Sequence, residues 1–155
     1  MFIIIKKMDR IDKKILNNIQ QNFPLSPLPY EELEKEIRIP KEEIFKRVKS
    51  LIEKGIIRGI RAVLNPKKLD FYSTLCAAKV PTEKMEKFIS VVNSYDEVTH
   101  NYERDAELNI WFTLVAENKK RVHDIIHDIS NLTGINPIYN FPAKKVFKIN
   151  VKFDL

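Results

Sequence analysis

Residues 97–116 read EVTHNYERDAELNIWFTLVA, and this segment indicates how the second half of the chain folds. Two runs that contain β-branched and aromatic residues, 97–104 and 108–116, flank the short segment 105–107 (DAE). Two such runs on either side of a short polar turn are typical of a β-hairpin. We therefore expect two adjacent antiparallel strands here.

The segments around this hairpin complete a β-α-β-β-α-β order. A strand at 72–80 leads into a helix at 81–94, and a helix at 118–132 leads into a strand at 135–139. Both helices carry apolar residues at helical spacing. This order is the ferredoxin-like arrangement, an antiparallel sheet with two helices on one face. A further strand is expected at 145–153, where apolar and polar residues alternate.

The first half carries three helical patterns and then an extended segment. The helices are expected at 9–22, 30–39 and 41–55. Three prolines between residues 24 and 29 separate the first two helices, because proline cannot continue a helix. Residues 56–64 are β-branched and predict a strand. Three helices followed by a strand outline a winged helix-turn-helix.

The chain is therefore predicted to be an α+β protein with two domains. A winged helix-turn-helix domain is expected at 8–64, and a ferredoxin-like domain for ligand binding and dimerisation at 65–155. The 155 residues suffice for both. Residues 1–7 add nothing to the helical pattern, so Met8 is a candidate natural start.

The basic charge lies in the first half. The chain has a net charge of +6; residues 1–70 carry 16 Lys and Arg against 10 Asp and Glu, and the remainder carries 11 of each. A basic half suggests nucleic acid as a partner. However, Glu42 and Glu43 stand at the start of the third helix, where base-reading side chains would lie and where phosphates would repel them. We therefore expect no specific DNA binding.

Several classes of protein are not favoured. No apolar run approaches the roughly 20 residues of a membrane helix. Cys76 is the single cysteine, so no internal disulfide forms, and the cytoplasm is the expected compartment. Three glycines cannot build a phosphate-binding loop. His123 and His127 lie one helical turn apart without a third ligand, so no metal site is expected.

The hairpin carries side chains that suit chemistry better than a simple core. The candidates on it are His100, Tyr102, Arg104, Asn109 and Trp111. With Arg58 and Arg61 from the segment after the third helix, they provide aromatic walls and cations for a flat ligand with several carboxylates. The alternative is that they stabilise the sheet of a dimer. A dimer is expected in either case, because the second face of the sheet needs cover.

The whole pattern resembles the leucine-responsive (Lrp/AsnC) regulators over most of the chain, from 9–12 (DRID) to 64–66 (LNP) and beyond. Local signatures narrow the resemblance to sirohaem decarboxylase subunits: FPLSPLPY at 23–30, VTHNYER at 98–104 and NIWFT at 109–113. The tail at 142–149 (PAKKVFKI) is more similar to the A-type subunit than to the B-type. One motif departs from the family: at 57–62 the chain reads IRGIRA, so Arg58 matches, Gly59 stands where the family has a second arginine, and Arg61 replaces a glycine.

This resemblance implies removal of CO2 from two acetate side chains of sirohaem, giving didecarboxysirohaem on a route to haem or haem d1. His100 would donate the proton, with Tyr102 as second candidate, or His100 would ligate the iron. Arg58, Arg61, Arg104, Asn109 and Trp111 would bind the substrate. No cofactor is required, because the tetrapyrrole is an electron sink and iron comes with the sirohaem substrate. The expected partner is a homologous B-type subunit or a second copy. The alternative function is a DNA-binding regulator that responds to a small molecule.

Overall fold

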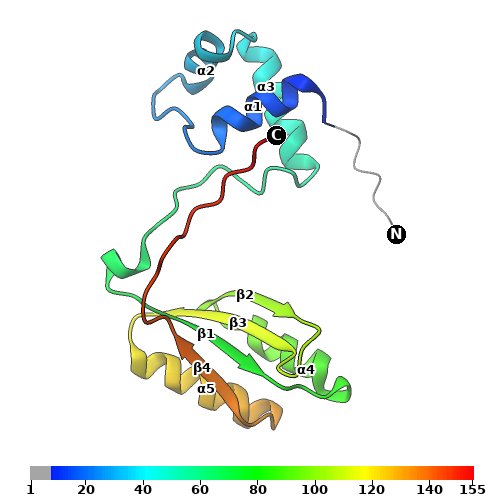
Figure 1. Cartoon of the computed structure of the whole chain (residues 1–155), viewed down its shortest axis with the longest axis vertical. Helices are drawn as coiled ribbons and strands as arrows, with labels where there is room; N and C mark the ends of the chain where they lie inside the picture. The colour runs from blue at the N-terminus through cyan, green and yellow to red at the C-terminus, as the bar shows by residue number, and fades with distance from the viewer. Residues whose placement is uncertain (1–7) are drawn as a thin grey trace. The chain divides into compact units, whose positions relative to one another are not determined.

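The computed structural model describes residues 8–155, which form two compact units (Figure 1). The first unit contains residues 8–62 together with Lys148–Leu155, and the second contains Val63–Phe147. Residues 148–155 therefore pack with the first unit although they follow the second in sequence. The domain limits 8–64 and 65–155 remain a prediction. The candidate start at Met8 concerns residues 1–7, which lie outside the described part of the chain.

Three helices build the first unit: α1 (Arg10–Ile19), α2 (Pro29–Ile37) and α3 (Lys41–Glu53). Asp9 begins α1, because its carboxylate accepts hydrogen bonds from the N–H groups of Ile11 and Asp12. The apolar faces of the helices meet in a core made of Ile15, Leu33, Ile37, Ile44 and Val48. The three predicted helices are confirmed, although α1 ends at Ile19 and not at Asn22.

Gly55 terminates α3, as its position in the sequence predicts. Its φ of +69° is the left-handed conformation that glycine adopts without a steric cost. The N–H of Ile56 donates to the carbonyl of Leu51, and the N–H of Gly55 donates to the carbonyl of Ile52. These two bonds form the Schellman pattern that satisfies the last carbonyls of a helix.

The predicted strand at 56–64 is not formed. No strand of residues 8–155 pairs with this segment, and a strand depends on a paired neighbour for its hydrogen bonds. Ile57 packs against the helical core instead, whereas Val63 and Leu64 are largely exposed. The first unit is thus a helix-turn-helix whose wing strand is missing.

The second unit is a four-stranded antiparallel sheet with two α-helices. Its strands are β1 (Tyr72–Ala78), β2 (Val98–Glu103), β3 (Ile110–Ala116) and β4 (Ile138–Pro142), in the order β2-β3-β1-β4. The helices α4 (Met85–Asn93) and α5 (Lys119–Thr133) lie on one face (Figure 1). Two short 3-10 helices, η1 (Pro66–Leu69) and η2 (Thr82–Lys84), precede β1 and α4. The predicted β-α-β-β-α-β order is confirmed.

The core of the second unit lies between the sheet and its helices. Along β3 every second residue is buried, among them Ile110, Phe112 and Leu114. Phe112 packs against Phe88 of α4 with ring centroids 6.3 Å apart. The remaining residues of the strands point away from the helices, and we call the surface that they form the open face of the sheet. No helix within residues 8–155 has the length and apolar character needed to cross a membrane.

The last part of the chain differs from the prediction. The fourth strand spans Ile138–Pro142 and not 135–139, and no strand forms at 145–153. Ile135 is buried in the core, so the residues before Ile138 return the chain from α5 to the sheet. The pairing of β4 with β1 ends where Pro142 meets Thr74. Beyond it, residues 143–155 have no neighbouring strand in the described chain.

Candidate functional site

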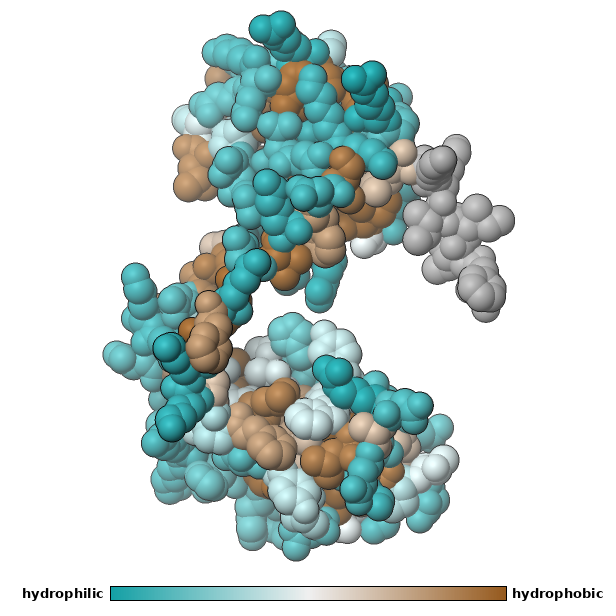
Figure 2. All heavy atoms as spheres, viewed as in Figure 1, coloured by the Kyte–Doolittle hydropathy of each residue, from teal (hydrophilic) through white to brown (hydrophobic). Residues whose placement is uncertain are grey.

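The open face of the sheet holds most of the predicted site residues. Cross-strand partners form two rows on it, Tyr102–Trp111–Ala77–Tyr139 and His100–Thr113–Leu75–Phe141. Each row begins on β2 with one of the two predicted proton donors. Figure 2 shows apolar and aromatic side chains gathered over the middle of this face, with hydrophilic side chains around them.

Aromatic rings follow one another across the open face. The centroids of Trp111 and Phe141 are 5.8 Å apart at an interplanar angle of 20°, and those of Tyr139 and Phe141 are 6.1 Å apart at 22°. Ala77 lies between two of these rings in its row and is completely buried, although it points away from the helices. The rings therefore cover its small side chain. An aromatic surface thus extends from β3 to β4.

On β2, the His100 and Tyr102 rings lie next to each other, with centroids 6.1 Å apart and an interplanar angle of 22°. The pairing of β2 with β3 shifts between Val98 and His100, which leaves Thr99 without a partner in the register. The Thr99 hydroxyl lies 3.0 Å from Nδ1 of His100. Because Nδ1 is engaged, Nε2 is the imidazole nitrogen left to meet a ligand.

Arg104 and Trp111 contact each other at the end of the hairpin. The guanidinium carbon of Arg104 lies 5.9 Å from the centroid of the indole ring, a cation–π distance. The indole N–H of Trp111 donates to the carbonyl of Leu108 at 2.6 Å, which fixes the ring. The structure therefore places a cation at the border of the aromatic surface.

Asn109 uses both ends of its side-chain amide within the protein. Its Oδ1 accepts from the N–H of Val80 at 2.8 Å, and its Nδ2 donates to the carbonyl of Val80 at 2.9 Å. These bonds tie the start of β3 to the end of β1. The substrate contact predicted for Asn109 stays a prediction, while its visible role is to position the hairpin.

Arg58 and Arg61 belong to the first unit, in the extended segment after α3. Both side chains are exposed, and neither forms an ion pair within residues 8–155. The structure therefore shows two free guanidinium groups in the first unit and the other five predicted residues together in the second.

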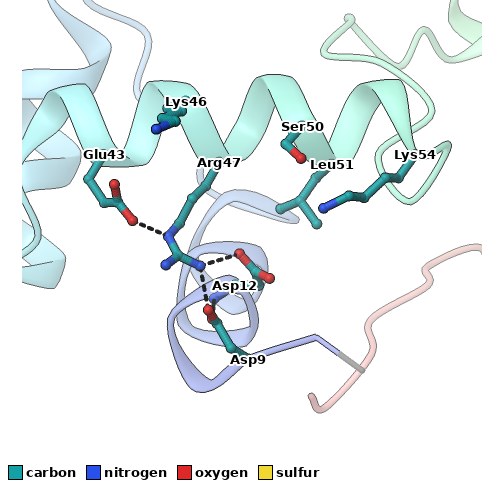
Figure 3. Close-up of a pocket in the computed structure, with 8 residues that line it drawn as sticks. All are labelled: Asp9, Asp12, Glu43, Lys46, Arg47, Ser50, Leu51 and Lys54. Carbon is teal, nitrogen blue, oxygen red and sulfur yellow. Dashed lines mark hydrogen bonds and ion pairs between the residues drawn. The ribbon is translucent and has the colours of Figure 1, made fainter. Parts of the chain in front are cut away.

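A pocket of about 410 Å³ lies on the first unit and contains none of the predicted site residues. Arg47 of α3 donates to Asp9 at 2.6 Å and to Asp12 at 2.8 Å, and it also pairs with Glu43 (Figure 3). These three carboxylates raise the pKa of Arg47 above its usual value. The charged side chains that line the pocket are thus engaged in ion pairs with each other. These ion pairs give the pocket a structural role between α1 and α3.

Tyr139 and Phe141 were not among the predicted site residues. Both stand on the open face of β4, and each is about half exposed, at 45% and 44%. The alternation in residues 138–141 (IYNF) places two aromatic residues at positions i and i+2 and was the available signal. Within residues 8–155 no group of three or more His, Cys, Asp or Glu side chains could hold a metal ion.

Comparison with known proteins assigns both parts of the chain. A model of the AsnC-like ligand binding domain matches residues 68–148, and a model of the "Siroheme decarboxylase NirDL-like HTH domain" matches residues 12–58. Escherichia coli AsnC superposes with a TM-score of 0.78 at 21% identity over 94% of this chain and 97% of its own. These matches define the class: a helix-turn-helix unit followed by an AsnC-like ligand-binding domain.

More similar sequences identify the family within this class. The siroheme decarboxylase alpha subunit of Desulfovibrio desulfuricans is 46% identical over 94% of this chain and 84% of its own length. The siroheme decarboxylase NirDL, solved in complex with an iron-uroporphyrin III analogue, is 31% identical with a TM-score of 0.66, over 83% of this chain and 42% of that chain. The chain belongs to the sirohaem decarboxylase family, and it is a subunit of a carboxy-lyase.

Proposed function

We propose that the open face of the sheet binds sirohaem and that its β2 edge delivers the proton that completes each decarboxylation. The observation that carries this proposal is the series of neighbouring aromatic residues that leads from His100 and Tyr102 on β2 through Trp111 on β3 to Phe141 on β4, with Arg104 at its border. A flat conjugated ligand gains contact area from such rings. The complex of the NirDL relative with an iron-uroporphyrin analogue supports a tetrapyrrole as the ligand of this family.

The reaction needs a carboxylate held in place, an electron sink and a proton. When an acetate side chain loses CO2, the C–C bond breaks and its electron pair passes into the conjugated macrocycle. The resulting carbon then takes up one proton and becomes a methyl group. The change is redox-neutral, so sirohaem with its own iron supplies the electron sink and no further cofactor is needed. The protein has to hold carboxylates and to deliver a proton.

His100 is the proposed proton donor. Histidine is the side chain best suited to exchange a proton near neutral pH. Its Nδ1 is engaged by Thr99 at 3.0 Å, which orients the ring and leaves Nε2 available to a ligand. Tyr102, whose ring neighbours that of His100, is the second candidate for the proton donor. The competing role for the same Nε2 is ligation of the sirohaem iron, which would fix the macrocycle and leave proton transfer to Tyr102.

The arginines are proposed to hold the carboxylates of the substrate. A guanidinium group pairs with a carboxylate through two parallel hydrogen bonds, which fixes orientation as well as charge. Arg104 stands at the border of the aromatic surface, held over Trp111. Arg58 and Arg61 are exposed and carry no ion pair in the described residues, so both are available to a ligand.

A homologous subunit is the proposed partner. The D. desulfuricans relative is described as an alpha subunit, a term for one member of an assembly with a second kind of chain. The open face of this chain is rich in half-exposed rings, and a surface of that kind is stable in water when a ligand or another protein covers it. A second subunit over the same face would enclose the tetrapyrrole and exclude water.

The proposal is tested by incubating the purified protein anaerobically with sirohaem and following absorbance and product mass. His100→Ala is expected to bind sirohaem with nearly unchanged affinity and to lower turnover by roughly 10²–10⁴-fold, the usual scale of general acid catalysis. The matched control is His123→Ala, because His123 is an exposed histidine on α5, on the helical side of the sheet. Wild-type turnover of His100→Ala would contradict the assigned role and transfer it to Tyr102. Loss of sirohaem binding would instead indicate iron ligation.

A further inference from the structure

Strand β2 contains one residue more than the part of β3 with which it pairs. Val98 pairs with Leu114 of β3. The next pair joins His100 to Thr113, so β2 advances by two residues while β3 advances by one. Thr99 is the extra residue of this β-bulge. Bulges bend a strand and re-aim its side chains, and they are over-represented next to active sites.

The bulge changes the face of the sheet on which the following residues lie. Val98 packs against the core between the sheet and the helices. Asn101 lies on the same side, because its Nδ2 donates to Oδ1 of Asn93 in α4 at 2.9 Å. Side chains alternate along a regular strand, so two residues three positions apart would lie on opposite faces. The extra residue allows both of these side chains to face the helices.

The bulge also decides where the two proposed proton donors lie. A shift of one residue moves a whole set of side chains to the other face of a sheet. In a regular strand anchored by Val98, His100 and Tyr102 would share its face and point toward the helices. The bulge instead places them opposite the residues of β3 that face away from the helices, Thr113 and Trp111.

Thr99 contacts the ring that the bulge redirects. Consecutive side chains of a regular strand point to opposite faces. At the bulge, however, the Thr99 hydroxyl lies 3.0 Å from Nδ1 of His100. A hydroxyl can accept a hydrogen bond as well as donate one. It can therefore accept from Nδ1–H while the ring is charged, and it can keep this bond after Nε2 has given its proton away.

We propose that Thr99 is a positioning residue of the decarboxylation: its place in the bulge turns His100 to the open face, and its hydroxyl holds Nδ1 so that Nε2 delivers the proton. This inference rests on the proposed role of His100. In each transfer the Nε2–H bond breaks, the proton passes to the carbon that has lost CO2, and the neutral ring keeps its proton on Nδ1. Nε2 then takes up the next proton from water.

The kinetic test compares Thr99→Val with Thr99→Ser. Valine keeps the β-branched shape but removes the hydroxyl, whereas serine keeps the hydroxyl. Thr99→Val is expected to lower the turnover of sirohaem roughly 10-fold, the upper scale of one hydrogen bond, with an unchanged Kd for sirohaem. Thr99→Ser is expected to restore turnover close to that of the wild type. Thr82→Val is the control for loss of a threonine hydroxyl, because Thr82 is exposed in η2.

Wild-type turnover of Thr99→Val, or an equal loss in Thr99→Ser, would overturn the proposal. A double substitution shows whether Thr99 acts through His100. In the His100→Ala protein, Thr99→Val is expected to have no further effect on turnover, because the ring that it positions is absent. A further loss of the same size would mean that Thr99 acts on something else, and the proposal would fall.

Nitrogen NMR without substrate separates this inference from the proposed function. The chain has three histidines, and His100→Ala assigns the ring signals of His100. Thr99→Val is expected to shift the Nδ1 signal of His100 and to leave the signals of His123 and His127 in place. An unmoved Nδ1 signal would overturn the inference whatever the turnover. The expected shift together with wild-type turnover of His100→Ala would confirm the contact and overturn the proposed function instead.

Proton NMR of the same protein tests the bulge. Cross-strand partners on one face have their Cβ atoms about 5 Å apart. Nuclear Overhauser contacts are therefore expected between the His100 ring and the methyl group of Thr113. Contacts between the His100 ring and the buried Phe112 would indicate a regular strand, and they would overturn the role given to Thr99.

Discussion

Arg58 and His100 are expected to respond differently to truncation, because one is proposed to hold a carboxylate and the other to deliver a proton. Arg58→Ala removes a charge-assisted bond of about 1.5–3 kcal/mol, so the Kd for sirohaem is expected to rise roughly 10–100-fold. Turnover falls as well, because the acetate loses its orientation. Absorbance titration with sirohaem and single-turnover measurements separate these effects.

Lys49→Ala is the control for this measurement, since Lys49 is an exposed cation on α3. An unchanged affinity in Arg58→Ala would remove Arg58 from the substrate site. Arg61→Ala then decides whether Arg61, which replaces a glycine of the family motif, has acquired the role of the arginine that the motif lacks here.

Phe141 is expected to contribute to tetrapyrrole binding through its ring. It stacks on Trp111 at 5.8 Å and is 44% exposed, so it presents an apolar surface to a ligand. Phe141→Ala is expected to weaken sirohaem binding roughly 5–10-fold, the scale of an aromatic contact. Leu132→Ala, on an exposed site of α5, is the control. Unchanged binding, measured by the same titration, would mean that the ligand does not extend to β4.

Among the contacts between helices, the ion pairs of Arg47 are those whose loss we expect to lower thermal stability most clearly. It links α3 to both acidic residues at the start of α1. Arg47→Met leaves three carboxylates without their cation and is expected to lower the thermal midpoint of the first unit by roughly 5 °C at neutral pH. Lys46→Met is the control, because Lys46 lines the same pocket without an ion pair in the described residues.

The same contact predicts a dependence on pH. The N–H of Asp12 and the guanidinium of Arg47 both donate to Asp9 and hold the pKa of its carboxyl below the usual range. The bonds therefore stabilise the fold above about pH 4, where the carboxyl is ionised in the unfolded chain too. Their contribution is lost as the pH falls through the lowered pKa of the folded protein. The difference between Arg47→Met and the wild type should shrink from pH 7 to pH 2, and a constant difference would contradict this account.

Strands and helices were predictable where their pattern is satisfied inside one chain. The alternation of residues 110–116 and the glycine at position 55 each specify a local structure that the fold then uses. The same alternation at 145–153 misled the prediction, because a strand needs a neighbour and none lies beside it in the described chain. The amides of Asn17 and Gln20 hold the segment instead, a contact across more than a hundred residues that no local pattern reveals.

The part of the site that lies within one local element was predictable from the sequence. His100, Tyr102 and Trp111 share one hairpin, so their spacing alone places them on a common surface. Phe141 joins them only through the pairing of β4 with β1, which depends on the topology of the whole sheet. The amide of Asn109 looks like a ligand-binding group in the sequence, and its two bonds to Val80 become visible only when β1 and β3 are placed together.

At the scale of the whole molecule, the helix-turn-helix unit and the net charge of +6 suggest DNA, and the details of α3 oppose it. Arg47 is neutralised by three carboxylates, and Glu42 and Glu43 stand in the first turn of α3. We expect no sequence-specific duplex binding at physiological salt. The remaining lysines should give weak retention, with a Kd of roughly 10⁻⁴–10⁻⁶ M. The affinity should fall steeply as salt is added. Fluorescence anisotropy with random and genomic duplexes at two salt concentrations measures both properties. Nanomolar binding to one sequence at physiological salt would show that the unit retains the function of a regulator.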